Sequence, residues 1–156
     1  MNMTVTKSYT FDYAHRLMGI DGKLYDKNKC GSLHGHTGKI EITVERYYGN
    51  IDTEENKHDN NFEFVMDYKF FKPIKEWIDE HFDHACIISV NDDKLLEFCK
   101  SEKMRFHKIH IGCANSENML KSMWSFIVNF IPDHVIITSM KLYETPTSYA
   151  EYKPGE

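Results

Sequence analysis

Two segments in the first third of the chain alternate between polar and apolar residues, a pattern typical of β-strands with one buried face. Within residues 38–45, Ile40, Ile42 and Val44 alternate with charged residues and threonine. In residues 3–14 the larger side chains occupy every second position: Val5, Lys7, Tyr9, Phe11 and Tyr13. Successive side chains of a strand point to opposite faces, so each set shares a face. We therefore predict strands at about residues 3–14 and 36–48.

A helix is predicted after a polar connection at residues 49–62. Its apolar residues recur at three- and four-residue spacing: Phe71, Ile74, Trp77, Ile78 and Phe82. Asp67 is a suitable N-cap for this helix, although Pro73 is equally suited to mark its first turn, which would leave residues 68–72 irregular.

The second half of the chain begins with a charged stretch, residues 91–106, and a short predicted strand, His107–Gly112. A second helix then starts near Asn115 or Ser116 and ends at Pro132. One face of this helix carries four apolar residues: Met119, Met123, Ile127 and Phe130.

The final segment, Val135–Tyr152, is strand-like, with Ile136, Met140 and Leu142 on one face and Glu144 on that same face. The order of elements is ββαβαβ or ββααββ, which predicts an α+β fold with helices layered on one face of an antiparallel sheet. No repeat or linker divides the 156 residues, so we expect a single domain, 1–156.

Composition excludes several classes of protein. No apolar run approaches the ~18 residues that span a membrane, and the N-terminus does not resemble a signal peptide. The net charge is −5, without a lysine or arginine run, which argues against a nucleic-acid binder. Four cysteines in a chain of this length do not form a disulfide scaffold. We expect a cytoplasmic protein with its cysteines as thiols.

Three histidines extend the buried faces of the first two strands. The first series continues into His15, and the second, followed backward, reaches His36 and His34. A buried imidazole without a partner is costly, whereas a metal-bound one is satisfied. The three residues therefore predict a Zn²⁺ site, and three protein ligands with an open position are typical of catalytic zinc. We interpret the remaining histidines as core or surface residues: His58, His81, His107, His110 and His134.

Three other residues or pairs carry candidate chemistry. Cys30 is either a fourth zinc ligand, which would make the site structural, or a thiolate beside the metal that acts as a base. Asp83 and His84 form a proton-transfer unit if the carboxylate orients the ring, although such a pair is also typical of a solvated helix end. Glu144, on an apolar face, needs a strong partner, such as two parallel N–H donors.

Six motifs occur in an order that resembles the 6-pyruvoyl-tetrahydropterin synthase and 6-carboxy-tetrahydropterin synthase family, from near residue 8 to the C-terminus. They are Phe11-Asp12-Tyr13-Ala14-His15-Arg16-Leu17, Cys30-x-x-x-His34-Gly35-His36, Met66-Asp67-Tyr68, Phe82-Asp83-His84, Ser116-Glu117-Asn118 and Tyr143-Glu144-Thr145-Pro146. The resemblance implies the tunnelling fold, a four-stranded antiparallel sheet with two helices. It also implies a homohexamer, a dimer of trimers in which the sheets close into a barrel.

The resemblance further implies a role for each matching residue. Zinc would be held by His15, His34 and His36. The catalytic residues would be Cys30, Asp83 and His84. Glu144 would bind the pterin through the ring's 2-amino and N–H groups. Ser116 and Glu117 match a position of further substrate contacts, although Asn115-Ser116 departs from the commoner threonine-containing form.

The implied substrate is 7,8-dihydroneopterin triphosphate, for which Arg16, Lys23, Lys27 and Lys29 are candidate triphosphate contacts. Three residues separate Cys30 from His34. This spacing resembles that of the bacterial enzymes of the queuosine (7-deazaguanine) pathway, which release acetaldehyde and triphosphate and form 6-carboxy-tetrahydropterin. The pyruvoyl-forming animal enzymes usually have a longer spacing.

Three alternatives remain open at this point. One is 6-pyruvoyl-tetrahydropterin synthase, which eliminates triphosphate. Another is a different pterin enzyme of the same fold, such as an aldolase, an epimerase or a cyclohydrolase-like enzyme. The third is a non-catalytic zinc module in which Cys30 closes the coordination sphere.

Overall fold

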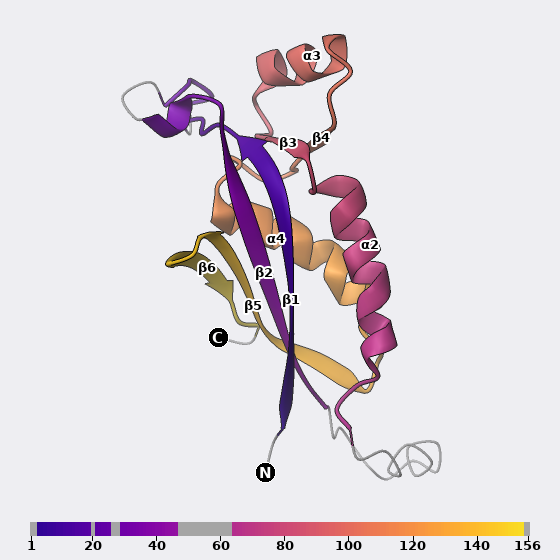
Figure 1. Ribbon diagram of the computed structural model, residues 1–156. Helices are drawn as coiled ribbons and strands as arrows, with labels where there is room; N and C mark the ends of the chain where they lie inside the picture. The colour runs from indigo at the N-terminus through magenta and orange to yellow at the C-terminus, as the bar shows by residue number, and fades with distance from the viewer. Residues whose placement is uncertain (1–2, 20, 26–28, 47–63, 155–156) are drawn as a thin grey trace.

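The structure, a computed structural model, describes residues 3–19, 21–25, 29–46 and 64–154 (Figure 1). The chain begins with two long strands, β1 (Thr4–His15) and β2 (His34–Arg46), with the 3₁₀ turn η1 (Lys29–Gly31) between them. The other elements follow in the order η3 (Tyr68–Phe71), α2 (Lys72–His81), β3 (Ala85–Ile88), α3 (Asp93–Ser101), β4 (Phe106–Lys108), α4 (Ser116–Ile127), η4 (Val128–Phe130), β5 (Val135–Thr145) and β6 (Ser148–Tyr152).

Within the described ranges the sheet has six strands, in the order β4-β3-β1-β2-β5-β6. The pairs β1–β2, β2–β5 and β5–β6 are antiparallel, whereas β3 is parallel to both β1 and β4. The prediction of a four-stranded antiparallel sheet was therefore wrong in strand number and direction. β3 has four residues, all buried, so it lacks the alternation by which a strand is recognised. The final segment folds back on itself as the β5–β6 hairpin.

The described residues form three α-helices, one more than predicted. Figure 1 shows α2 and α4 side by side on one face of the long strands, as expected. The additional helix, α3, lies within the charged stretch at residues 91–106 and buries only Leu95 and Cys99. These two residues pack with Cys86 and Ile88 of β3, whereas Ala85 and Ile87 of the same strand belong to the main core. α3 therefore covers the opposite face of β3, which corrects the expectation that all helices share one face.

Both residues predicted to mark the start of the first helix, Asp67 and Pro73, do so, because a 3₁₀ turn precedes the α-helix. The Asp67 side chain accepts a hydrogen bond from the Lys69 amide and caps η3, and α2 proper begins at Lys72, with Pro73 in its first turn. Asn115 caps α4 by accepting from the amide of Asn118 at 3.0 Å. No helix within the described parts of the chain is long and apolar enough to cross a membrane.

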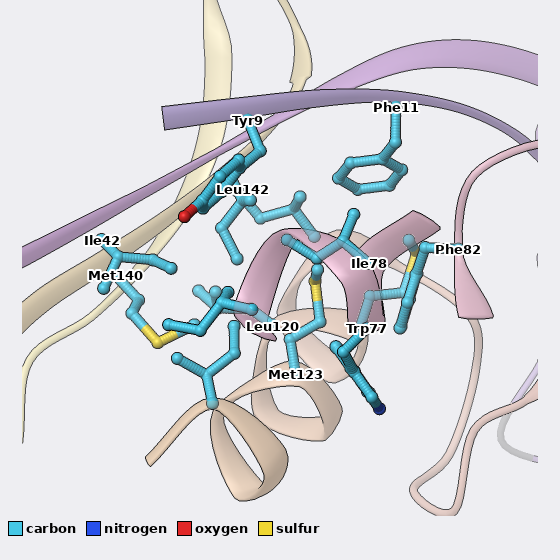
Figure 2. Close-up of a cluster of buried hydrophobic side chains, with 14 of the residues drawn as sticks. Tyr9, Phe11, Ile42, Trp77, Ile78, Phe82, Leu120, Met123, Met140 and Leu142 are labelled. Atoms are coloured by element: carbon cyan, nitrogen blue, oxygen red, sulfur yellow. The ribbon is translucent and has the colours of Figure 1, made fainter. Parts of the chain in front are cut away.

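The core lies between the inward face of the long strands and the two helices that cover it (Figure 2). Phe11 and Ile42 of the sheet and Ile78 of α2 are almost completely buried. The hydroxyl group of Tyr9 donates to the carbonyl oxygen of Phe71 at 2.7 Å, so this core tyrosine has its polar atom paired. Burial of these residues determines which face the rest of each strand presents to the helices.

A β-bulge changes the face of one predicted core residue in β5. Thr43 of β2 pairs with Ser139, and the next residue, Val44, pairs with Ile137, so Thr138 has no opposite partner. Before the bulge Ile137 is buried, whereas Ile136, which was predicted to face the core, is 40% exposed. After it, Met140 and Leu142 point inward as predicted, and Glu144 follows on their face.

Candidate metal centre

The three candidate zinc ligands meet where β1 ends and β2 begins. His15 is paired across the two strands with His34, and Tyr13 is paired with His36. The ring centroids lie 4.7 Å apart for His15 and His34, 4.9 Å for His34 and His36, and 5.1 Å for His15 and His36. β5, hydrogen-bonded to the other edge of β2, brings Glu144 to the same place. One ligand atom from each of these four side chains lies within 4.8 Å of the others.

The orientation of the imidazole rings suits a cation. The Nδ1 atom of His15 donates to the carbonyl oxygen of Ala114 at 2.6 Å, and that of His34 donates to the carbonyl oxygen of Ser32 at 2.7 Å. A ring protonated at Nδ1 presents a lone pair at Nε2. The Nε2 atoms of His15 and His36 are buried and have no well-aligned hydrogen bond. Buried polar atoms of this kind are satisfied by a metal ion, so the residues fit a zinc site.

Glu144 belongs to this group of side chains. Its Oε1 atom lies 3.2 Å from Nε2 of His15 and 3.3 Å from Nε2 of His36. Interaction with His15 is the main reason why the pKa of Glu144 is lower than usual, against the opposing effect of burial. Burial in turn lowers the pKa of His36, which favours the neutral imidazole that a metal requires. The carboxylate therefore lies at the metal group as well as on the inward face of the sheet.

Cys30 lies in η1, half-buried, near the same end of the sheet. Its carbonyl oxygen accepts a hydrogen bond from the Leu17 amide at 2.8 Å, two residues beyond His15. Among the described residues, the group that could hold a metal consists of the three histidines and Glu144, without Cys30. This composition favours the interpretation of Cys30 as a thiol near the metal over that of a fourth ligand.

Asp83 and His84 form a hydrogen-bonded pair directly after α2. Oδ2 of Asp83 accepts from Nδ1 of His84 at 2.9 Å, and Oδ1 accepts from the backbone amide of Asp12 at 2.9 Å. The bond from Asp12 is the main cause that lowers the pKa of the Asp83 carboxyl group. The backbone of His84, in the left-handed region at φ 56°, donates to the carbonyl oxygen of Asp12 at 2.6 Å. β1 therefore holds both members of the pair.

The Asp83–His84 pair lies at the edge of β1, bonded to the backbone of Asp12, whereas the metal group lies on the inward face of that strand. Asp12 is exposed, whereas Tyr13 and His15 are buried on the inward face. The side chain of His84 is 72% exposed and borders a shallow hollow of about 360 Å³, whose lining includes Asp12 and Arg105. The structure thus forms the predicted pair but does not bring it into contact with the three histidines in one chain.

The remaining candidates have different surroundings. Ser116 and Glu117 occupy the first turn of α4, where the Ser116 hydroxyl group donates to Oε2 of Glu117 at 3.4 Å. Nε and Nη2 of Arg16 each donate to Asp92 at 2.7 Å, so this candidate phosphate contact is engaged in a partly buried ion pair.

Among the candidate lysines, Lys23 lies 3.5 Å from Asp21 at the surface, and Lys29 is exposed. Lys27 lies outside the described residues.

The partners that support the metal group were not predicted from the sequence. The carbonyl oxygen of Ala114 has no signature in the sequence because every residue carries such a group. Asp92 was foreseeable only as a possible N-cap, since it precedes α3 and accepts from the Leu95 amide at 3.2 Å. The closeness of Glu144 to the histidines did have a signal, because the strand patterns placed all four side chains on inward faces.

Comparison with known proteins gives one family. The sequence profile described as 6-pyruvoyl tetrahydropterin synthase matches residues 4–155. A relative from Rickettsia felis named 6-carboxy-5,6,7,8-tetrahydropterin synthase is 31% identical over 150 residues, which cover 94% of this chain and 96% of the relative. The chain therefore belongs to the 6-pyruvoyl tetrahydropterin synthase family.

Solved structures confirm the fold. An uncharacterised protein from Wolinella succinogenes superposes with a TM-score of 0.71 at 20% identity, covering 99% of both chains. The 6-pyruvoyl tetrahydropterin synthase of Caenorhabditis elegans superposes with a TM-score of 0.64, also at 20% identity, covering 99% of this chain and 97% of the other. The expected tunnelling fold is thus confirmed, with the additional strands and helix described above.

Proposed function

We propose that this protein is a zinc-dependent lyase that converts 7,8-dihydroneopterin triphosphate and water to 6-carboxy-5,6,7,8-tetrahydropterin, acetaldehyde and triphosphate. The observation that carries the proposal is the group of His15, His34 and His36, in which the buried Nε2 atoms of His15 and His36 are left for a cation, on the fold of a pterin synthase family. Three imidazoles at the end of a sheet are the ligand set expected of catalytic zinc.

Bound at the three imidazoles, zinc supplies a Lewis acid that polarises the hydroxyl groups of the substrate's side chain. Cys30 acts as a general base on that side chain, and His84 exchanges protons with it. Asp83 holds the His84 ring with its proton on Nδ1, which leaves Nε2 to accept a proton. Glu144, with Ser116 and Glu117, binds the pterin ring.

We propose that the complete active site requires more than one copy of the chain. The metal group lies on the inward face of β1, whereas the exposed His84 ring borders a hollow whose lining includes Asp12, Ala14 and Cys86, so a second copy would have to supply one of them. The sheet also ends in the edge strands β4 and β6, which favour pairing with another chain. These features support a homohexamer, a dimer of trimers, with substrate bound between subunits.

The choice of product rests on the relatives. The Rickettsia felis protein is named as a 6-carboxy-tetrahydropterin synthase, and so is one from Aquifex aeolicus that is 28% identical over 98% of this chain. A 6-pyruvoyl product is the second candidate, favoured by the name of the family and of the Caenorhabditis elegans protein. With the carboxy product, the protein would serve the cytoplasmic synthesis of queuosine and related 7-deazaguanines.

Mass spectrometry of the products tests the proposal. Zinc-loaded protein is incubated with 7,8-dihydroneopterin triphosphate, with His34→Ala as the control. We expect 6-carboxy-tetrahydropterin and acetaldehyde from the wild-type protein alone. A 6-pyruvoyl product would contradict the carboxy assignment. Stoichiometric zinc without turnover of any dihydropterin would favour the non-catalytic zinc module.

A further inference from the structure

A chain of buried hydrogen bonds leads away from the metal group into the loop after β3. The Nδ1 atom of His15 donates to the carbonyl oxygen of Ala114 at 2.6 Å. The backbone amide of Ala114 in turn donates to the hydroxyl oxygen of Ser89 at 2.9 Å. All three residues are at most 1% exposed. The backbone of Ala114, with its carbonyl group on one side and its amide group on the other, thus connects a candidate metal ligand to a serine side chain that no part of the proposed mechanism uses.

The loop that carries Ser89 is itself firmly held. The Asp92 amide donates to the carbonyl oxygen of Ser89 at 3.1 Å, and the Val90 amide donates to the carbonyl oxygen of Gly112 at 3.0 Å. Arg16, the residue after His15, binds the Asp92 carboxylate through two hydrogen bonds of 2.7 Å. The end of β1 is therefore joined to this loop by two routes, one through His15 and one through Arg16.

We infer that Ser89 is a positioning residue for the metal centre, acting on His15 through the backbone of Ala114. The inference rests on the proposed metal site. A carbonyl group that accepts from a metal-bound histidine sets the protonated nitrogen, the direction of the ring and the basicity of its other nitrogen. Here the direction of that carbonyl depends on the hydroxyl group that accepts from the amide of the same residue.

Loss of this hydroxyl group is expected to disturb the metal site. Without Ser89 Oγ, the amide of Ala114 is a buried donor without its acceptor, which is unfavourable. The peptide group between Cys113 and Ala114 can relieve that cost by rotating toward another acceptor. This rotation changes the φ angle of Ala114 and so displaces the next peptide group, whose carbonyl oxygen accepts from His15. Removal of a partner that orients a ligand typically lowers metal affinity about 10- to 100-fold, and we expect the lower end because Ser89 acts indirectly, through the backbone of Ala114.

The chain offers a matched control. Ser122 of α4 is also buried, at 4% exposed, but its hydroxyl group has no hydrogen-bond partner among the described residues. Ser89→Ala and Ser122→Ala remove the same atom from similarly buried positions. Zinc affinity of the folded proteins is measured by competition with a chromogenic chelator, and the absorption spectrum of bound Co²⁺ reports the geometry of the ligands.

We expect Ser89→Ala to bind zinc about tenfold more weakly than wild type and to change the Co²⁺ spectrum, while Ser122→Ala matches wild type in both. A merely structural serine would lower the free energy of unfolding equally with and without zinc and leave the affinity unchanged, which would overturn the inference. If Ser89→Ala does not fold, Ser89→Cys, which keeps a weak acceptor, is expected to show a smaller loss of affinity in the same direction. Wild-type affinity in that variant would equally overturn the inference.

Zinc binding by the wild-type protein distinguishes failure of the proposed metal centre from failure of the proposed role of Ser89. If it binds no zinc, the proposed metal centre fails. If it binds about one zinc per chain and Ser89→Ala binds as tightly, only the role of Ser89 fails.

Discussion

Individual side chains carry most of the proposed chemistry. The main surprise is Glu144, which was interpreted as the residue that binds the pterin and lies within 3.3 Å of two imidazole nitrogens. A carboxylate in that position is suited both to a ring with paired N–H donors and to a cation. Substitutions at single positions can separate these roles.

The histidine ligands give the first prediction. The purified protein should contain about one zinc per chain, and His34→Ala or His36→Ala should lose most of it, because two imidazoles are a poor site for zinc. Metal analysis by mass spectrometry checks this. His110→Ala, which changes an exposed histidine, is the control and should keep its zinc. Full zinc occupancy in His34→Ala and His36→Ala would show that the ligands are misassigned.

Cys30 is expected to matter for turnover and not for metal retention. Cys30→Ala should retain zinc and bind pterin, while turnover falls by about 100-fold or more, the scale of a lost general base. Steady-state kinetics combined with zinc analysis test this. Zinc loss in this variant would instead favour the structural site in which Cys30 is the fourth ligand.

Glu144→Gln tests the pterin-binding role. The amide keeps the volume but replaces one acceptor with a donor, and a hydrogen bond to a charged group contributes about 1.5–3 kcal/mol. The affinity for a dihydropterin such as sepiapterin should therefore fall at least tenfold, while the three histidines retain the zinc. Titration of both proteins, with zinc analysis alongside, distinguishes the outcomes. Unchanged pterin affinity together with loss of zinc would make Glu144 a metal ligand instead.

At the scale of elements, the short strand β4 places a histidine beside α2. β4 contributes His107, whose ring lies 4.7 Å from that of Phe82 and 5.6 Å from that of His81. Burial is the main cause that lowers the pKa of His107 to about 4, with smaller contributions from His81 and His110. Its Nε2 atom is buried without a hydrogen bond. β4 therefore holds a neutral histidine against the end of α2.

This histidine predicts a loss of stability in acid. In the unfolded chain His107 takes up a proton near pH 6.5, whereas in the folded protein it does so only near pH 4. The unfolded state thus binds more protons between these values, and the free energy of unfolding should fall by about 2 kcal/mol from pH 6.5 to pH 4. Urea unfolding of metal-free protein measures this. His107→Phe, which suits the aromatic surroundings, should flatten the slope, and an unchanged slope would contradict the assignment.

At the scale of the whole molecule, the open question is assembly. The sheet ends in β4 on one side and β6 on the other, and β5 and β6 form a hairpin that reaches beyond the helices (Figure 1). Closure of such edges between copies would form a barrel and remove the unpaired backbone groups. It would also offer a way to bring the metal group of one chain to the Asp83–His84 pair of another.

Assembly and activity should therefore go together. We expect light scattering at micromolar concentration to give the mass of a hexamer, and dissociated chains to lose activity while each retains zinc. Zinc content is the internal control, because all the candidate ligands belong to one chain. A monomer with full activity would contradict the shared active site.

The sequence by itself determined the long strands, the two helices that cover them and the inward direction of the histidines. Period-two alternation in β1 and β2 and helical spacing in α2 and α4 are local properties, readable because one face of each element is buried. The Asp83–His84 hydrogen bond was also foreseeable, since its members are adjacent.

Only the tertiary structure decided the rest, because those features depend on contacts between distant segments. β3 is buried on both faces by neighbours that come from elsewhere in the chain, so it shows no alternation. The bulge at Thr138 reflects the pairing of β5 with β2, and it decides that Ile137 and not Ile136 is buried. The alternation within its strand indicated that Glu144 points inward. Its contact with His15 and the link from His15 to Ser89 nevertheless arise where separate chain segments meet, and the alternation within one strand does not say which segments these are.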